Sequence, residues 1–536
     1  MWDDWWRGSV VYEIYPRSFQ DGDGDGIGDL AGIVRRLPRV AALGVDAIWI
    51  APFYRSPMKD FGYDVSDYCA VDPTFGTLAD FDRVVAEAHA LGLKVLIDQV
   101  WCHTSDRHPW FLESCADPAG RRGDWYVWAD AKADGSPPNN WLSVFGGPAW
   151  RWDPRRRQYF LHHFLASQPK LNLRNPDVLD ALAGVGEFWL DRGVDGFRLD
   201  AVDFMLHDPE LRDNPPRPPA DGQMPVKPFG LQTHLYDMAH PDTLAVTRRI
   251  RALMDRYPGT TTIAEVSSEF DALHRASDYT GGDGDRLHMA YTLRLTRGAF
   301  DAGHLRTVIA EVEDRFADGG WLCWAFSNHD VERVASRWGD GSAACVKMML
   351  ALLLSLRGGI CLYQGEELGL PEAELPYEAL RDPYGINFFP QFKGRDGCRT
   401  PIPWEAGAPN GGFSTAPPWL PLPREHLPLA VGAQEADAHS VLNAARALLR
   451  WRRSQPALRD GKLRLLASDG DVLAFERGSG DAAILCAFNI APLPAALPLA
   501  EGWALLDGYG LPVPARRAGT VELPPYGFLF AGRVGN

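Results

Sequence analysis

Three carboxylates stand where predicted β-strands end: Asp200 after the fourth of eight predicted strands, Glu265 after the fifth and Asp330 after the seventh. Hydrolysis of a glycosidic bond needs at least two carboxylates, one to protonate the leaving oxygen and one to attack carbon or to activate water. A single aspartate at a strand end is more often a cap or a loop anchor, so the prediction rests on all three together. Arg198 lies two residues before Asp200, on the same side of the strand, where its charge would lower the pKa of Asp200.

The elements that must position these side chains recur along the chain as a short β-branched or aromatic run, a loop and a helix-like stretch. This pattern is typical of βα units around a parallel sheet. Eight such units predict a closed (β/α)8 TIM barrel, in which residues just past the C-terminal ends of the strands converge on one pocket. The predicted strands are 10–15, 47–51, 95–100, 196–199, 262–264, 287–292, 322–326 and 359–362.

The remaining segments predict three domains. Residues 1–103 and 177–458 form the catalytic barrel, and its last long helix spans 434–455. Residues 104–176, rich in Trp, Pro, Gly and Arg, are too many for a barrel connection after strand 3 and predict an inserted subdomain. Residues 459–536 predict a C-terminal all-β sandwich. A second long loop, 207–241, contains the proline-dense stretch 214–219 and is suited to a lid.

The composition excludes several classes of partner. The 536 residues include 54 Lys and Arg against 70 Asp and Glu, a net charge of −16, which argues against nucleic acid or an anionic membrane. The N-terminus lacks the pattern of a secretory signal, and no run approaches the ~18–20 apolar residues of a membrane span, so we expect a cytoplasmic location. The eight cysteines form no CxxC pair and are expected to be reduced. Monomer and homodimer both stay open.

Motifs at successive predicted strand ends, taken as a set, resemble the α-amylase family of glycoside hydrolases, family 13, in its α-glucosidase and oligo-1,6-glucosidase branch. The resemblance implies that Asp200 is the nucleophile, Glu265 the general acid/base, and Asp330 the carboxylate that stabilises the transition state. It extends over nearly the whole chain and rests on segments 98–103, 168–172, 196–200, 264–266, 326–330, 363–367 and 395–401.

The same resemblance implies a sugar-binding shell and a pocket that acts on the non-reducing end. Its hydrophobic walls would be Phe145 and Phe164, from the inserted subdomain. A carboxylate and an arginine can each hold adjacent sugar hydroxyls at the closed end of such a pocket. The residues expected to grip the terminal glucose are Tyr63, Asp64, His103, Arg198, His329 and Arg399.

A loop of alternating Asp and Gly, residues 21–29, is typical of a cation site. It is no EF-hand, because its twelfth position is Gly32 where an EF-hand needs Glu. Related glucosidases bind Ca²⁺ or Mg²⁺ at the equivalent loop, so a structural Ca²⁺ or Mg²⁺ is expected there, with an empty acidic turn as the alternative. The expected ligands are Asp21, Asp23, Asp25, Ile27 and Asp29.

Two departures from the family pattern bear on metal and substrate. Cys102 stands where many members have Asn, and a thiol is a poor ligand for Ca²⁺, so no calcium is expected there. Ala201 stands where members restricted to α-1,6 bonds have Val, and the smaller side chain leaves space for an α-1,4-linked aglycone. We therefore expect an exo-acting, retaining α-glucosidase that cleaves short substrates such as maltose and malto-oligosaccharides, with transglucosylation as a side activity.

Three alternatives stay open at this point. The motif 168–172 mixes features of two branches, so an oligo-1,6-glucosidase remains possible in principle. A sucrose-active glucosyltransferase or isomerase is the second, although the Arg-x-Asp-Arg pattern associated with isomerases is absent after Asp330. A noncatalytic binding protein on the same fold is the third, and it predicts lost carboxylates and a membrane span, neither of which the sequence shows.

Overall fold

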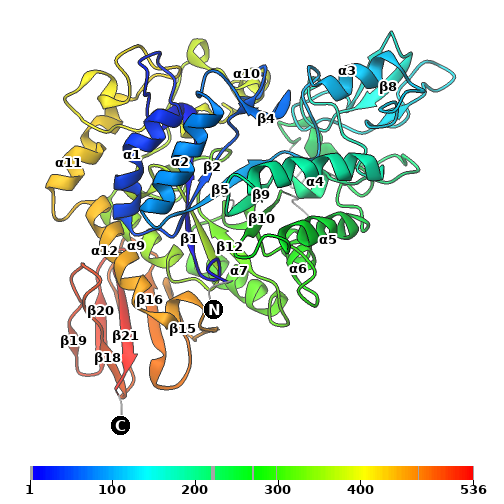
Figure 1. Ribbon diagram of the computed structural model, residues 1–536. Helices are drawn as coiled ribbons and strands as arrows, with labels where there is room; N and C mark the ends of the chain where they lie inside the picture. Colours follow the sequence, from blue (N-terminus) through cyan, green and yellow to red (C-terminus); the bar gives the residue numbers. More distant parts are fainter. Residues whose placement is uncertain (1–3, 219–223, 268–270, 297, 469, 535–536) are drawn as a thin grey trace.

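Eight parallel strands close into a barrel at the centre of the computed structural model, which describes residues 4–218, 224–267, 271–296, 298–468 and 470–534 (Figure 1). The predicted barrel is thereby confirmed, and each predicted strand overlaps one observed strand. Around the barrel, the order of neighbours is β1-β13-β12-β11-β10-β9-β5-β2. The strands are β1 (Val10–Ile14), β2 (Ala47–Ile50), β5 (Lys94–Gln99), β9 (Gly196–Leu199), β10 (Thr261–Val266), β11 (Met289–Thr292), β12 (Leu322–Ala325) and β13 (Gly359–Tyr363).

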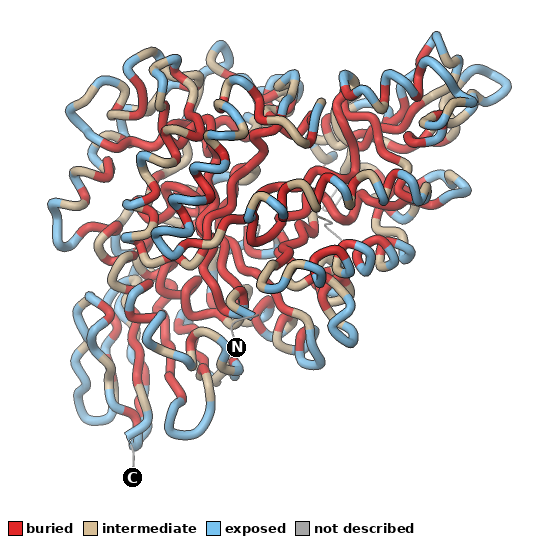
Figure 2. Tube along the Cα trace, viewed as in Figure 1, coloured by how far each residue is buried: buried red, intermediate tan, exposed pale blue. Residues whose placement is uncertain are grey.

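The barrel strands are buried on both faces, because side chains fill the interior and helices cover the outside (Figure 2). Trp49, Leu96 and Met289 belong to the interior cluster. The longer helices are α1 (Leu30–Leu43), α2 (Leu78–Ala90), α4 (Pro176–Leu190), α5 (Thr243–Met254), α6 (Ala272–Thr280), α7 (Ala302–Arg315), α9 (Ala343–Leu353) and α12 (Val441–Arg453). The shorter ones are α3 (Pro109–Ala116), α8 (Val334–Arg337), α10 (Pro383–Phe388), α11 (Val431–Ala436) and α13 (Pro456–Arg459).

The excursion after the third barrel strand folds as a small unit of its own at one end of the barrel (Figure 1). It holds α3 and a three-stranded antiparallel sheet, β6 (Trp128–Ala129), β8 (Gln158–Leu161) and β7 (Trp150–Asp153), in that order. A bridge between His103 and Lys170 pins its two ends together. The hairpin of β3 (Tyr54–Arg55) and β4 (Asp67–Val71) lies in the loop after β2. These segments add to the wall of the site described below.

The long loop 207–241 is anchored to the inserted segment. The Asn140 side chain donates to the Asn214 carbonyl at 2.9 Å, and Gln232 donates to the Asn140 carbonyl at 2.7 Å. A bridge joins Pro216 to Gln232 across the loop. Residues 219–223, which include the last proline of the predicted proline-dense stretch, lie outside the described residues. The described part of the loop is thus held beside the open end of the barrel.

The C-terminal segment forms two antiparallel sheets, which agrees with the predicted all-β domain. The first has the order β14 (Leu463–Leu465), β15 (Val472–Arg477), β16 (Ile484–Asn489), β21 (Phe528–Arg533) and β18 (Trp503–Leu505). The second has the order β17 (Ala495–Pro498), β20 (Thr520–Leu523) and β19 (Arg516–Arg517). The single helix predicted over 434–455 is wrong: α11 ends at Ala436, and Ser440 starts α12 by accepting from the Asn443 amide.

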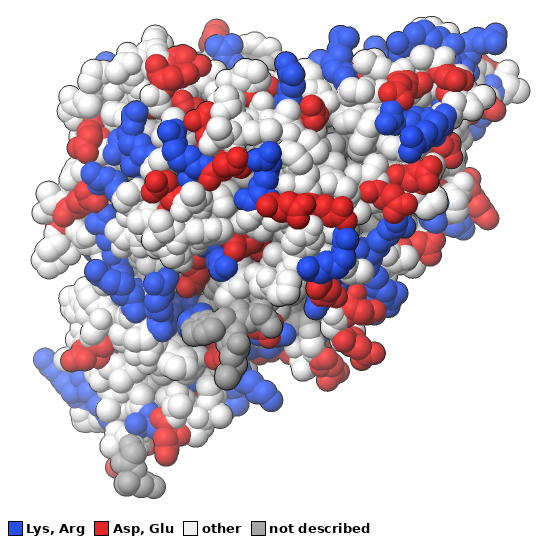
Figure 3. Space-filling view, in the orientation of Figure 1, with Lys and Arg blue, Asp and Glu red and all other residues white. Residues whose placement is uncertain are grey.

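The charged side chains are mixed over the face shown in Figure 3, where Lys and Arg alternate with Asp and Glu. Among the described residues, none of the helices is both long and apolar enough to cross a membrane.

Candidate active site

The three predicted carboxylates line one cavity at the C-terminal end of the barrel, next to the buried guanidinium of Arg198. Asp200 directly follows β9, Glu265 lies in β10, and Asp330 follows β12. Arg198 Nη1 donates to Asp200 Oδ1 at 2.7 Å, and Nη2 lies 2.6 Å from Glu265 Oε2. The same Nη1 donates to Asp98 at 2.8 Å. One cation therefore binds three carboxylates, two of them predicted to be catalytic.

Burial governs the proton affinity of the catalytic pair. It raises the pKa of Asp200 to about 7. Arg198 lowers that pKa, as expected, but desolvation outweighs the ion pair. Burial also raises the pKa of Glu265 to about 7, opposed by Arg198 and reinforced by Asp200. Both groups therefore keep a proton to a higher pH than an ordinary carboxyl does. One group can then attack as a carboxylate while the other donates a proton.

Asp330 is held in the opposite state. Burial by itself would raise the pKa of Asp330, but His329, Arg395 and Arg399 lower it far below the usual range of an aspartate. Its Oδ1 accepts from Arg399 at 2.7 Å and from Arg395 at 3.2 Å, and it lies 3.5 Å from His329 Nε2. Asp330 is therefore a fixed negative charge beside the acid/base pair.

A chain of hydrogen bonds joins Glu13, which the sequence analysis did not single out, to this site. The buried Glu13 in β1 accepts from His329 Nδ1 at 2.5 Å. His329 Nε2 lies 2.6 Å from the Tyr63 hydroxyl, which donates to Asp98 at 3.1 Å. Because the phenolic hydrogen goes to Asp98, the hydrogen between Tyr63 and His329 comes from Nε2. Burial raises the pKa of Glu13 to about 7, opposed by His329.

The closed end of the cavity corrects one prediction. Asp64 is not among the residues that line the cavity, because its carboxylate accepts from Ser56 at 2.9 Å and from the amides of Lys59 and Asp60, both at 3.0 Å. It shapes the loop that presents Asp60. Asp60 and Arg395 do line the cavity and form an ion pair at 2.8 Å. Asp60 lies only four residues before the expected aspartate.

The other predicted shell residues fall into two layers. Tyr63, His103, Phe145 and Phe164 line the cavity, as the sequence analysis expects for residues that contact a sugar. Arg198, His329 and Arg399 lie behind that surface, where they bind the carboxylates. Arg399 donates to Asp330 and to the His329 carbonyl and does not line the cavity. Arg395 is the arginine beside Asp330 that does.

The cavity is large enough for an oligosaccharide end. Its volume is about 1250 Å³, at or above the upper end of the usual range for small-molecule sites. The loop 207–241 contributes Met224, Val226, Lys227 and Phe229 to the lining. Aromatic residues line the cavity next to this loop: Lys227 Nζ lies 4.3 Å from the Tyr384 ring, and the rings of Phe145 and Tyr384 are 4.8 Å apart. Such apolar surface suits the C–H faces of sugars.

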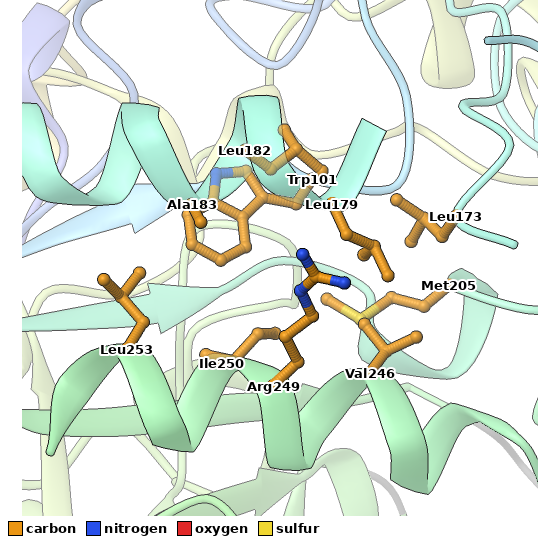
Figure 4. A pocket seen from close by; sticks show the side chains of 10 residues that line it. All are labelled: Trp101, Leu173, Leu179, Leu182, Ala183, Met205, Val246, Arg249, Ile250 and Leu253. Atoms are coloured by element: carbon orange, nitrogen blue, oxygen red, sulfur yellow. The ribbon is translucent and has the colours of Figure 1, made fainter. Parts of the chain in front are cut away.

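A second cavity lies between α4 and α5 and differs in kind (Figure 4). Its volume is about 20 Å³, roughly that of one water molecule, and Trp101, Leu182 and Leu253 are among its mostly apolar lining side chains. It has neither the size nor the polar groups for a sugar, so we take it as a packing defect of the barrel wall.

The Asp-rich loop brings together only part of the predicted ligand set. The carboxylates of Asp21, Asp23 and Asp29 lie within 4.8 Å of one another. Asp25 is outside this group, and its carboxylate accepts from the Ile27 amide at 2.7 Å. Each Asp29 oxygen accepts one backbone amide and retains a lone pair, whereas Asp21 accepts from three amides and the Ser414 hydroxyl, so an ion would have to displace part of that set. Three carboxylates so arranged fit a hard dication such as Ca²⁺ or Mg²⁺.

Comparison with known proteins agrees with this site. The family model of the α-amylase catalytic domain matches residues 13–461. A probable α-glucosidase of Rhizobium meliloti is 53% identical over 98% of this chain and 97% of its own. An oligo-1,6-glucosidase of Heyndrickxia coagulans is 35% identical over 94% and 96%. The crystal structure of the α-glucosyl transfer enzyme XgtA is 51% identical, covers 99% of both chains and superimposes with a TM-score of 0.95.

The matched catalytic domain and the 53% identical relative show that this barrel is a glycoside hydrolase. The chain belongs to the α-amylase family, glycoside hydrolase family 13, in its α-glucosidase and oligo-1,6-glucosidase branch.

Proposed function

We propose that this protein is a retaining, exo-acting α-glucosidase that hydrolyses terminal α-1,4 bonds of short substrates such as maltose. The single observation that carries the proposal is the pairing of Asp200 and Glu265 on the Arg198 guanidinium, at the wall of one cavity. A retaining glycosidase needs one ionised and one protonated carboxyl on either side of the scissile bond.

In the first step, the ionised Asp200 attacks the anomeric carbon while Glu265 gives its proton to the glycosidic oxygen, and the aglycone leaves. The bond between carbon and the leaving oxygen breaks as the ester to Asp200 forms. The ester form of Asp200 is uncharged, so its ion pair with Arg198 is lost, while Arg198 keeps its hydrogen bond to Asp98. Asp330, ionised beside the pair, stabilises the positive charge that develops on the sugar.

In the second step, Glu265 takes a proton from water, the water oxygen attacks the same carbon, and the ester to Asp200 breaks. A sugar hydroxyl can replace water in this step, which gives transglucosylation. The likeness to an enzyme described as transferring α-glucosyl groups supports this side activity.

The substrate class is argued from Ala201 and from the loop 207–241. Ala201 lines the cavity directly after Asp200, and its methyl group leaves space beside the scissile bond. The loop lines the same cavity, which favours short substrates over starch. The ion pair of Asp60 and Arg395 offers hydroxyl partners at the end where a terminal glucose would sit. Cleavage of α-1,6 bonds and of sucrose are the alternatives.

We also propose that the loop 21–29 binds a structural Ca²⁺ or Mg²⁺ through Asp21, Asp23 and Asp29, with Asp25 and the Ile27 carbonyl as further ligands after a local adjustment. The ion would offset repulsion among the carboxylates and tie the loop to the start of α1, which Asp29 caps. Chelation should lower the melting temperature of the wild type and leave that of Asp21→Ala unchanged. An equal change of melting temperature in the two proteins would contradict the proposed cation site.

Proton NMR with maltose tests the catalytic proposal. Glucose released from the non-reducing end should appear first as the α-anomer, before mutarotation, because two displacements at carbon retain its configuration. Early β-glucose would exclude a covalent intermediate. Intact maltose would remove the α-1,4 assignment and favour α-1,6 bonds or sucrose.

A further inference from the structure

Cys102 places a buried thiol close to Asp200, the proposed nucleophile. It lies three residues beyond the end of β5, at 1% exposure, and is followed by His103. The Cys102 sulfur, a ring nitrogen of His103 and a carboxylate oxygen of Asp200 all lie within 4.8 Å of one another. The geometry points to a site for a divalent transition metal, best matched by Zn²⁺, formed by these three side chains.

The hydrogen bonds of His103 prepare it to act as a ligand. Its Nε2 lies 2.9 Å from the Tyr63 carbonyl, which can only accept, and 3.2 Å from the Gln168 amide nitrogen, which donates to Asp60. We therefore assign the ring hydrogen to Nε2, directed at the carbonyl. Nδ1 then carries a lone pair and lies 3.1 Å from the Cys102 sulfur. A backbone carbonyl that orients a histidine through its other nitrogen is the usual support of a metal-binding imidazole.

Asp200 can join such a site without losing its ion pair, since Arg198 donates to Oδ1 and Oδ2 remains for an ion. A thiolate, an imidazole and a carboxylate are ligands that Zn²⁺ accepts, whereas Ca²⁺ prefers oxygen alone. Two anionic ligands would balance the charge of the dication, and the thiol proton would pass to the solvent. His103 and Asp200 line the cavity, so a water molecule can take the fourth position.

A metal bound here would occupy the nucleophile and the place of the sugar, so it should inhibit in competition with substrate. The inhibition rests on the proposed role of Asp200, but binding of the metal does not. A spectroscopic measurement of binding therefore separates a failure of this inference from a failure of the proposed function.

Co²⁺, which takes the same ligands as Zn²⁺, is the probe for that measurement. The wild type should bind it with a sulfur-to-cobalt charge-transfer band in the near ultraviolet, and Zn²⁺ should abolish the band. An ion in the oxygen-only loop 21–29 gives no such band, because a sulfur ligand is required. Zn²⁺ should also inhibit maltose hydrolysis competitively and reversibly on chelation.

Two variants and one control assign the band. Cys102→Ser and Cys102→Ala should lose it and should weaken Zn²⁺ inhibition at least about tenfold, since even an outer partner of a metal ligand is worth ~10–100-fold in affinity. Cys69→Ser is the control, because Cys69 is the one described cysteine that is not buried. It should retain both effects. A wild type without the band, or a band lost in Cys69→Ser and kept in both Cys102 variants, would overturn the site.

Discussion

Replacing Glu13 by glutamine should slow catalysis about tenfold without unfolding the barrel. Glutamine has the shape of glutamate, so its carbonyl oxygen can still accept from His329 Nδ1, while its amide takes the place of Oε2, an atom without a hydrogen-bond partner among the described residues. The variant cannot ionise, so it removes the negative charge that Glu13 carries above its raised pKa of about 7. A hydrogen bond between charged groups is worth about 1–1.5 kcal/mol more than a neutral one, and 1.36 kcal/mol corresponds to tenfold in rate.

The loss should reach the chemistry through His329, which lies 3.5 Å from Asp330 and contacts Tyr63. Steady-state kinetics with maltose should therefore show kcat/KM of Glu13→Gln reduced about tenfold. Glu367→Gln is the matched control, because Glu367 is buried at the end of the neighbouring strand and bonds to Tyr12 away from the cavity. Equal losses of kcat/KM in the two variants, or activity of Glu13→Gln within twofold of wild type, would refute a positioning role for Glu13.

Three further predictions concern the same cavity. The pH profile of kcat/KM should be bell-shaped around neutral pH, because Asp200 gains a proton at lower pH and Glu265 loses its proton at higher pH. Glu265→Gln, assayed with an activated aryl α-glucoside, should lack the fall in activity at alkaline pH. Asp60→Ala should raise KM at least tenfold with little effect on melting temperature, whereas Asp64→Ala should lower the melting temperature with little effect on KM. The same changes of KM and melting temperature in both variants would contradict the placement of the two carboxylates. Ala201→Val should lower the maltose-to-isomaltose activity ratio. It should also lower the melting temperature, since Ala201 has φ 46°, a left-handed conformation that a β-branched side chain adopts less readily than alanine. An unchanged activity ratio would contradict the steric account of linkage.

Much of the scaffold could be predicted because each barrel strand is a short buried run between a loop and a helix. The runs at 47–51 and 196–199 match their strands to within one residue. The helix predicted over 434–455 failed because its apolar spacing continues across Asp437, whereas local capping by Ser440 starts a new helix. Periodicity alone does not separate a continuous helix from two that share a face.

Site residues that belong to sequence motifs could be predicted. Those whose position depends only on packing could not. Glu13 looks like any polar residue in a strand, and its partner His329 lies 316 residues away. Asp60 and Asp64 share one motif, and only the fold of the loop shows which faces the cavity. The contact of Arg198 with Asp200 and its lowering effect on the pKa are confirmed, but a sequence does not show how completely the pair is buried, and burial makes the net shift upward.

The central claim is that Asp200 attacks carbon while Glu265 handles the proton, and azide rescue tests it most directly. Asp200→Ala and Glu265→Ala are each incubated with an activated aryl α-glucoside and azide, and the anomeric configuration of the glucosyl azide is read by NMR. We predict the β-azide from Asp200→Ala, because azide replaces the nucleophile in a single displacement. Glu265→Ala should give the α-azide, because azide then attacks the glucosyl-enzyme. The two configurations exchanged between the variants would contradict the assignment.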